Sequence, residues 1–343
     1  MVKQGLYINQ ISQLVKPETD WSICIGAGAS FPIFPTWTVL ANELAEQLGL
    51  KVPIEDRYKS YLSPDVIIQS TYELKGRPNT FAASLSNTLY ARLFEGLNNE
   101  DKQLVIDCIT SQTPVDNLDW GRYVKIIQSK GQTTSQKLAE YIAASIYKYN
   151  RPPKSIISFN AELLLPSLIN AYTQVSFKKH YKVLNYITEP TSSQYHGRIN
   201  YCFCHGLVSV PGARGASKKN FNSEDKLVFA ENEYLQLANS SFSWQAYSFM
   251  DTLLTSTVFF VGLSFTDPNV RRWLSWIHKC KTEAIKRFNP KSQESTSYYW
   301  VEQYVKEEKT RRWIEASVAH LGVRLVWVNE YSDIVDVLTK SIK

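Results

Sequence analysis

The sequence lacks the segments that mark membrane and secreted proteins. Its longest apolar run, around residues 257–263, falls far short of the ~18 residues that a helix needs to cross a bilayer. The first residues, Met-Val-Lys-Gln-Gly, show no charged-then-apolar export pattern. We therefore expect a cytoplasmic protein that makes no membrane contact.

Cysteine is also scarce. The five cysteines are an odd number, which suits a reducing cytosol better than a disulfide framework. No pair of Cys-x-x-Cys motifs is present, so we expect no structural zinc and no other metal. Cys202 and Cys204 lie two residues apart in an extended run, so both face one side of a strand. We interpret them as small core residues.

The excess of positive charge is small. The chain has 38 basic and 32 acidic residues, which gives a net charge of +6. That surplus permits contact with nucleic acid or acidic partners without indicating it. Basic clusters such as Lys178-Lys179-His180, Lys218-Lys219 and Arg311-Arg312 are short and scattered. We interpret them as solvated surface and leave direct contact with nucleic acid open.

The length and composition fit a globular α/β protein. The 343 residues are 44% apolar and 20% charged, enough for a core and too balanced for disorder. Short β-branched or aromatic runs predict buried strands at residues 21–25, 155–159, 199–203, 227–230, 257–262 and 323–328. Amphipathic stretches between several of them favour a Rossmann-like, mainly parallel sheet with helices on both faces.

One part of the chain has no strand signal. Between residues 52 and 150 the pattern predicts helices at 65–74, 80–97, 102–110 and 135–149. No Pro/Gly-rich linker marks the edges of this stretch, so we interpret it as a helical insertion within a single domain covering residues 1–343. The polar run at residues 211–223 is expected to be a mobile loop.

The strongest local motif is a strand that runs into Gly26-Ala27-Gly28-Ala29-Ser30. An amphipathic helix follows from about residue 36, with apolar positions that include Trp37 and with Gly49 as its stop. Glycines let a ligand approach the backbone, and the N–H groups of such a turn can hold phosphate oxygens. The motif is neither the dehydrogenase fingerprint, because Phe31 occupies the third glycine position, nor a Walker loop. The alternative is a tight turn of small residues.

A second strand-to-helix junction follows the apolar run near residue 260. It contains Gly262, Ser264 and Asp267-Pro268, and Asp267 fits a helix N-cap with proline at the first helical position. We expect Ser264 and the loop backbone to contact a ligand more readily than Asp267. Both junctions would open at the carboxyl edge of one parallel sheet, where nucleotides bind in such folds.

Two other strand ends carry polar side chains. Asn160 follows the apolar strand that ends at Phe159, and His205 follows the run that ends at Cys204. Taken singly, such an asparagine is a turn residue and such a histidine a hydrogen-bonded structural one. A functional role for either depends on their occurring together.

The order of these motifs resembles that of the sirtuin family. The series runs Gly-Ala-Gly-Ala-Ser, Pro-Thr-Trp, Ser-Phe-Asn, His-Gly and finally Gly-Leu-Ser-Phe-Thr-Asp-Pro-Asn from residue 262. The last motif is similar to the prokaryotic sirtuin-like branch found in antiphage defence proteins. The resemblance extends from about residue 20 to 340, without most of the helical stretch.

The resemblance implies an NAD site. It places the pyrophosphate and neighbouring ribose on Gly26, Gly28 and Ser30, with Ala27, Ala29 and Trp37 in the same motifs. It places Asn160 and His205 beside the nicotinamide ribose and Ser264 near the adenosine half, and it counts Gly262 and Asp267 among the residues that bind NAD. Glu162 stands where the family often has aspartate, so its role is open. Thr36-Trp37 replaces the Phe-Arg of the deacylases, and their four-cysteine zinc module is absent, which disfavours deacylation.

The chemistry of NAD then suggests an activity. Nicotinamide departs from NAD as a neutral molecule, so its departure needs no general acid. An amide that positions the ribose or the attacking water, together with an imidazole that acts as a base, is then sufficient. Our main hypothesis is an NAD hydrolase of the defence type, which forms linear or cyclic ADP-ribose. The alternatives are a non-catalytic NAD or ADP-ribose sensor or scaffold and, less favoured, a deacylase or ADP-ribosyl transferase. Because such an enzyme is toxic when unregulated, we expect a homo-oligomer or a separate activator, such as a HerA-type ATPase, an Argonaute-like protein or a phage protein.

Overall fold

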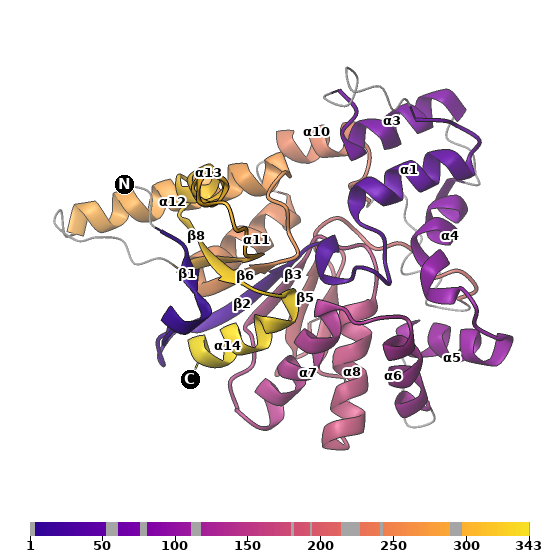
Figure 1. Cartoon of the computed structure of the whole chain (residues 1–343), viewed down its shortest axis with the longest axis horizontal. Helices are drawn as coiled ribbons and strands as arrows, with labels where there is room; N and C mark the ends of the chain where they lie inside the picture. The colour runs from indigo at the N-terminus through magenta and orange to yellow at the C-terminus, as the bar shows by residue number, and fades with distance from the viewer. Residues whose placement is uncertain are drawn as a thin grey trace.

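One parallel sheet organises the molecule. The computed structural model describes residues 4–52, 61–75, 81–110, 118–179, 182–192, 194–213, 227–240, 243–288 and 297–342. Their strands form one eight-stranded sheet in the order β1-β8-β7-β6-β2-β3-β5-β4, and every neighbouring pair is parallel (Figure 1). The strands are β1 (Leu6–Tyr7), β2 (Asp20–Ile25), β3 (Ser155–Ser158), β4 (Leu184–Ile187), β5 (Ile199–Phe203), β6 (Ser256–Val261), β7 (Tyr298–Gln303) and β8 (Val323–Val328). The predicted Rossmann-like α/β fold is confirmed, and all the described strands are parallel.

Helices cover both faces of this sheet. Because successive side chains of a strand point to opposite faces, Ile23 and Ile25 of β2 join one buried cluster while Cys24 joins another. The first face is covered by α7 (Thr134–Tyr147), α8 (Leu164–Phe177) and α14 (Ile334–Ile342). The second is covered by α11 (Trp244–Thr255), α12 (Pro268–Phe288) and α13 (Glu308–Ala319).

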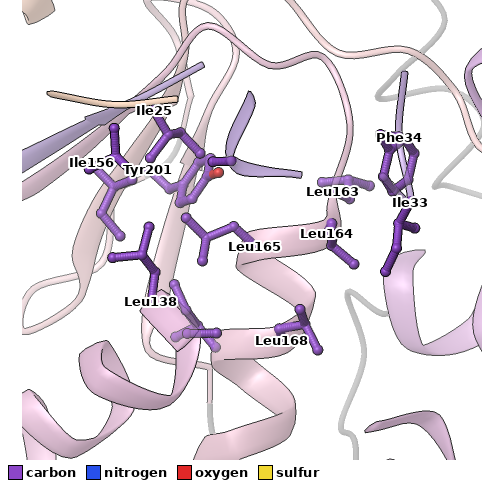
Figure 2. Packing of buried hydrophobic residues seen from close by; sticks show 14 of the residues in the cluster. Ile25, Ile33, Phe34, Leu138, Ile156, Leu163, Leu164, Leu165, Leu168 and Tyr201 are labelled. Atoms are coloured by element: carbon purple, nitrogen blue, oxygen red, sulfur yellow. The ribbon is translucent and has the colours of Figure 1, made fainter. Parts of the chain in front are cut away.

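The cluster on the first face is made of large aliphatic and aromatic side chains. Figure 2 shows the sheet residues Ile25, Ile156 and Tyr201 facing leucines of α7 and α8. All three are fully buried. Burial of an aliphatic or aromatic side chain of this size stabilises a fold by about 1.5–3 kcal/mol, so this layer holds the sheet rigid beneath its carboxyl edge.

The cysteines follow the predicted pattern. Cys24, Cys202 and Cys204 lie together in the cluster on the second face, so the interpretation of the last two as core residues is confirmed. Burial raises the pKa of Cys202 to about 12, which keeps that thiol protonated at neutral pH. Cys108 is also buried, whereas Cys280 on α12 is exposed.

The strand predicted at residues 227–230 is wrong. These residues run without strand pairing into α10 (Glu231–Asn239). The Glu233 carboxylate accepts hydrogen bonds from the N–H groups of Phe229 (2.8 Å) and Ala230 (2.7 Å), which removes the donors that a ladder would need. Phe229 is buried against Trp37, with ring centroids 4.6 Å apart, so its apolar character reflects core packing.

Between α1 (Trp37–Gln47) and β3, the described residues form helices and no strand, as predicted. It contains α3 (Pro64–Lys75), α4 (Phe81–Phe94), α5 (Asn99–Thr110), α6 (Trp120–Ser129) and α7. α3 and α4 pack against α1, whereas α7 lies between α8 and α14 in the layer on the sheet (Figure 1). One buried cluster joins these helices to the sheet, and the boundaries of an insertion at 52–150 stay a prediction.

Of the loop predicted at 211–223, residues 214–223 lie outside the described residues. Across the described ranges, no helix combines the length and apolarity of a membrane span.

Candidate active site

A pocket of about 1030 Å³ opens at the carboxyl edge of the sheet. It is lined by residues that follow β2, β3, β5, β6 and β8, and by Glu302 near the end of β7. It therefore spans β2, where the strand order changes direction between β3 on one side and β6 on the other. Parallel α/β sheets bind their ligands in the crevice at such a point.

The two glycine loops predicted from the sequence lie against each other at the base of this pocket. The N–H groups of Gly26 and Gly28 each donate to a main-chain oxygen, that of Val261 and that of Gly262, at 3.0 Å. A Cβ on Gly26 would lie 2.5 Å from the Gly262 oxygen, and one on Gly262 would lie 2.2 Å from the nitrogen of Ala29. These glycines are therefore required for the close approach of two backbones.

The glycine loop lines the pocket, but several of its N–H groups are hydrogen-bonded within the protein. Gly26, Ala27, Gly28 and Gly262 line the pocket. The N–H groups of residues 28, 29 and 30 donate within the protein, to the oxygens of residues 262, 26 and 27. Phosphate binding by this turn thus stays a prediction.

A buried polar network lies behind the first loop. The Ser30 hydroxyl donates to Oε1 of Glu162 at 2.7 Å, and Nδ2 of Asn160 donates to the same oxygen at 3.1 Å. The other carboxylate oxygen accepts from the N–H of Leu164 at the start of α8. Glu162 therefore fixes the glycine loop, the end of β3 and the N-terminus of α8 relative to one another. Ser30 and Asn160 belong to this network, and neither these two nor Ala29 are among the residues that line the pocket.

The side-chain oxygen of Asn160 is buried and has no hydrogen-bond partner among the described residues. Its side chain is 4% exposed, and among the described residues its Oδ1 has no hydrogen-bond partner. An unpaired buried acceptor costs about 1–3 kcal/mol. The structure thus keeps an unpaired acceptor on the residue two positions after β3, and a ligand hydroxyl or a water is the kind of donor that would satisfy it.

The buried Glu162 carboxyl makes stability depend on pH. Burial raises the pKa of Glu162 above its ordinary value of 4.5, against the opposing hydrogen bonds from Leu164, Ser30 and Asn160. A carboxyl whose pKa is raised by folding binds protons better when folded, so the protein loses stability as pH rises through the interval above 4.5. We expect the unfolding free energy of wild type, relative to Glu162→Gln, to fall as pH rises from 4 to 7.

Urea unfolding at a series of pH values checks this expectation. Glu46→Gln, on the exposed face of α1, is the control and is expected to follow wild type across the range. Parallel pH curves for wild type and Glu162→Gln would contradict the inferred shift.

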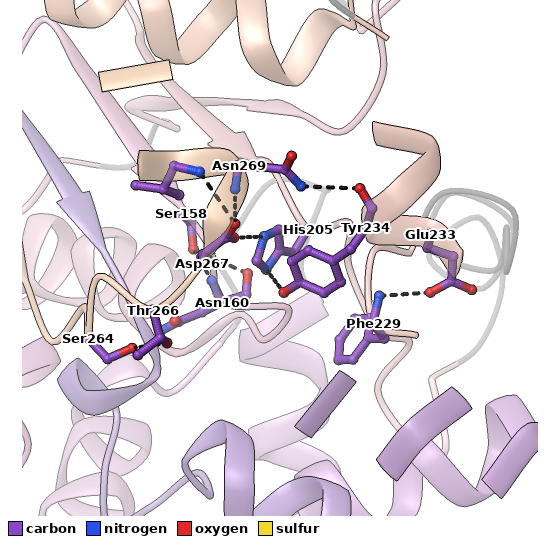
Figure 3. A network of polar contacts seen from close by, with 11 residues as sticks. Ser158, Asn160, His205, Phe229, Glu233, Tyr234, Ser264, Thr266, Asp267 and Asn269 are labelled. Carbon is purple, nitrogen blue, oxygen red and sulfur yellow. Dashed lines mark hydrogen bonds and ion pairs between the residues drawn. The ribbon is translucent and has the colours of Figure 1, made fainter. Parts of the chain in front are cut away.

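The imidazole of His205 contacts a carboxylate in the loop between β6 and α12. Its Nε2 lies 3.0 Å from Oδ2 of Asp267 (Figure 3). The other oxygen of Asp267 accepts from the N–H groups of Asn269 (2.7 Å) and Val270 (3.3 Å) at the start of α12. The predicted N-cap is therefore confirmed, and the same carboxylate also orients the imidazole, which sequence reasoning missed.

Aromatic rings enclose His205 on two sides. The ring centroid of Phe159 lies 5.1 Å from that of His205, and that of Tyr234 on α10 lies 5.3 Å away. Nδ1 of His205 is 3.5 Å from the Tyr234 hydroxyl. Tyr234 was not predicted, because an aromatic residue in the middle of a short helix carries no signal in a single sequence.

Two more predicted residues line the pocket, whereas Asn160 and His205 follow adjacent strands without a hydrogen bond between them among the described residues. Trp37 and Ser264 line it, and the Ser264 hydroxyl pairs with that of Thr266 at 2.7 Å. Asn160 and His205 follow the neighbouring strands β3 and β5, but no hydrogen bond joins them in the described part of the chain. That both groups contact one ligand stays a prediction.

The charge of the pocket is mainly negative. Its described lining contains the carboxylates of Asp65, Asp267, Glu302 and Glu330, and Lys137 is its single lysine or arginine. Carboxylates of this kind attract cationic groups and accept hydrogen bonds from hydroxyls. No group of three or more His, Cys, Asp or Glu side chains able to hold a metal occurs among the described residues.

Comparisons with known proteins agree with this geometry. Residues 156–321 match the SIR2-like domain family, and that range includes Asn160, His205 and Asp267. Over 126 residues, the chain is 31% identical to the NAD(+) hydrolase ThsA of Enterococcus faecium. That alignment covers 34% of this chain and 26% of the relative, so the chain spans about a quarter of that protein's length.

Proposed function

We propose that the protein is an NAD hydrolase that releases nicotinamide and ADP-ribose, because residues 156–321 match the SIR2-like domain family, in agreement with the sequence motifs. The observation that carries the proposal is the imidazole of His205, which Asp267 orients at a large pocket on the switch point of the sheet. An imidazole held in place by a carboxylate is suited to act as a general base.

The position of His205 suggests how NAD would lie. The nicotinamide ribose would sit over β3 and β5, within reach of His205 and above the unpaired oxygen of Asn160. The pyrophosphate would cross the glycine loop, and the adenosine would extend toward β7 and β8. Glu302 lies at that far end, four strands from His205, and at ~4.8 Å between strands the span is about 19 Å, which suits a dinucleotide.

The charges of the pocket would support cleavage. Asp65 and Asp267 lie in the pocket with Tyr234 and His205, where the cationic pyridinium would bind and the oxocarbenium-like ribose would form. Carboxylates already oriented toward a developing positive charge lower the barrier without reorganising. Nicotinamide departs with the electron pair of its glycosidic bond, and His205 is the final acceptor of the proton that the attacking water loses.

Purified protein incubated with NAD tests the proposal. We expect nicotinamide and ADP-ribose to appear in equal amounts, measured by chromatography, for the chain alone or with the product of its neighbouring gene. Binding of NAD by calorimetry without any nicotinamide release, in every oligomeric state, would instead support the second candidate, a non-catalytic NAD sensor. That candidate is favoured by the contacts that hold Asn160 to Glu162 and His205 to Asp267 within the protein.

The acidic far end predicts a preference for NAD over NADP. A 2′-phosphate on the adenosine ribose would approach Glu302 and Glu330, whereas carboxylates accept hydrogen bonds from free ribose hydroxyls. We expect kcat/KM for NADP to be about tenfold lower, or about 1.4 kcal/mol of like-charge repulsion. Glu302→Gln should narrow that ratio and Glu46→Gln should not, in parallel assays of both dinucleotides. An unchanged ratio in Glu302→Gln would place the adenosine elsewhere.

Regulation belongs to the same proposal. An unregulated NAD hydrolase would deplete the NAD of its own cell, so we propose that it acts in the cytoplasm as part of antiphage defence and is silent until triggered. Control would come from a homo-oligomer or from a sensor on another polypeptide, such as a HerA-type ATPase, an Argonaute-like protein or a phage protein. Light scattering of the purified chain, with nicotinamide release measured in each oligomeric fraction, separates the two.

A further inference from the structure

We infer that the Tyr234 hydroxyl is a catalytic group that passes the proton of the attacking water to Nδ1 of His205. The inference rests on the proposed NAD hydrolase activity. Its observations are the two contacts of the imidazole and the position of Tyr234 on the pocket wall.

The contact with Asp267 fixes which imidazole nitrogen is basic. Oδ2 of Asp267 lies 3.0 Å from Nε2, and this carboxylate also accepts two N–H donors at the start of α12. A carboxylate with those partners accepts a third hydrogen bond, so the proton of the neutral imidazole belongs on Nε2. Nδ1 then carries the lone pair, and Nδ1 is the nitrogen that faces Tyr234.

Tyr234 lines the pocket together with His205. Its hydroxyl is 3.5 Å from Nδ1, a long contact of the kind that tightens once a substrate is bound. Its main-chain oxygen accepts from Nδ2 of Asn269 at 3.3 Å, which ties α10 to the first turn of α12. The start of α12 therefore positions both groups: Asp267 orients His205, and Asn269 holds Tyr234 (Figure 3).

The step balances with these groups alone. As the bond between nicotinamide and ribose breaks, its electron pair goes to the pyridine nitrogen, and the water oxygen bonds the anomeric carbon. The water gives a proton to the Tyr234 oxygen, and Tyr234 gives its own proton to Nδ1. His205 ends as an imidazolium beside Asp267 and later releases the proton to solvent. No phenolate accumulates, which matters because burial raises the pKa of Tyr234 and the carboxylates of Asp267, Asp65 and Glu233 raise it further.

Kinetics of Tyr234→Phe test the relay. We expect kcat for nicotinamide release to fall about 10²-fold with KM for NAD nearly unchanged, because only proton transfer is lost. In mixtures of H2O and D2O, the rate of wild type should respond as two moving protons and that of the variant as one. Tyr247→Phe, a tyrosine on α11 that is 70% exposed, is the matched control and should behave as wild type in both measurements.

The outcomes separate the relay from the proposed function. An active wild type together with an equally active Tyr234→Phe overturns the relay and leaves the hydrolase intact. A wild type that releases no nicotinamide overturns both. If the variant folds poorly, NMR of ¹⁵N-histidine in wild type decides the matter, because a neutral His205 with its proton on Nδ1 could not accept one from Tyr234.

Discussion

Replacing His205 by alanine is expected to lower the rate of nicotinamide release by about 10²–10⁴-fold, the usual contribution of a general base. The loss should appear in kcat rather than in KM, because the imidazole acts on the attacking water and not on the bound ground state. Steady-state kinetics with NAD, followed by chromatography of nicotinamide, give both constants. His196→Ala, an exposed histidine outside the pocket, is the control and should keep full activity.

Variants of Asp267 and Asn160 refine this result. Asp267→Asn should reduce kcat less than His205→Ala, and Asp119→Asn, which replaces the N-cap of α6, controls for the loss of a helix cap. Asn160→Ala should be strongly impaired, since it removes the unpaired acceptor and a donor to Glu162. Full activity in both His205→Ala and Asn160→Ala would remove these residues from the mechanism.

Gly262→Ala is expected to destabilise the protein by about 3 kcal/mol or more and to abolish NAD binding. Residue 262 has φ +65°, and its added Cβ would overlap the Ala29 nitrogen at 2.2 Å. The Cβ is bonded directly to the main chain of one loop and the nitrogen belongs to the main chain of the other, so neither can move away without disturbing the hydrogen bond from the Gly28 N–H to the Gly262 oxygen. Urea unfolding and calorimetry with NAD measure the two losses.

Gly96→Ala separates packing from backbone strain in this experiment. Residue 96 has φ +67°, and nothing lies within 4 Å of its added Cβ. We expect Gly96→Ala to lower the unfolding free energy by only about 1 kcal/mol, the cost of placing a non-glycine residue in the left-handed region. Equal losses in the two variants would show that the contact between the glycine loops contributes nothing.

Part of the sheet could be predicted because several of its strands are long and apolar, although β7, which is also six residues long, was missed. Each of β2, β6 and β8 has six residues, and all six of β6 are buried. The four-residue β4 mixes Asn185 and Tyr186 with two aliphatic residues, and this signal is too short to distinguish from a turn. The run at 227–230 misled in the opposite direction, since side chains buried by core packing look like those of a strand.

The candidate site was predictable as a set of strand ends and not as a set of contacts. Turn chemistry and capping preferences indicated Gly26, Gly262 and Asp267 from local sequence alone. The pairing of His205 with Asp267 joins residues 62 positions apart, and Tyr234 is 29 positions from His205. Such pairs depend on how β5, α10 and α12 meet in space, which no periodicity within one segment specifies.

The distribution of thiols has a practical consequence for following assembly. Four cysteines are buried, and Cys280 alone is exposed, on a helix that covers the sheet face away from α7 and α8. A maleimide dye should therefore attach at this one natural position without mutagenesis. Mixing donor-labelled with acceptor-labelled chains would then report self-association by energy transfer, before and after NAD or an activating protein is added.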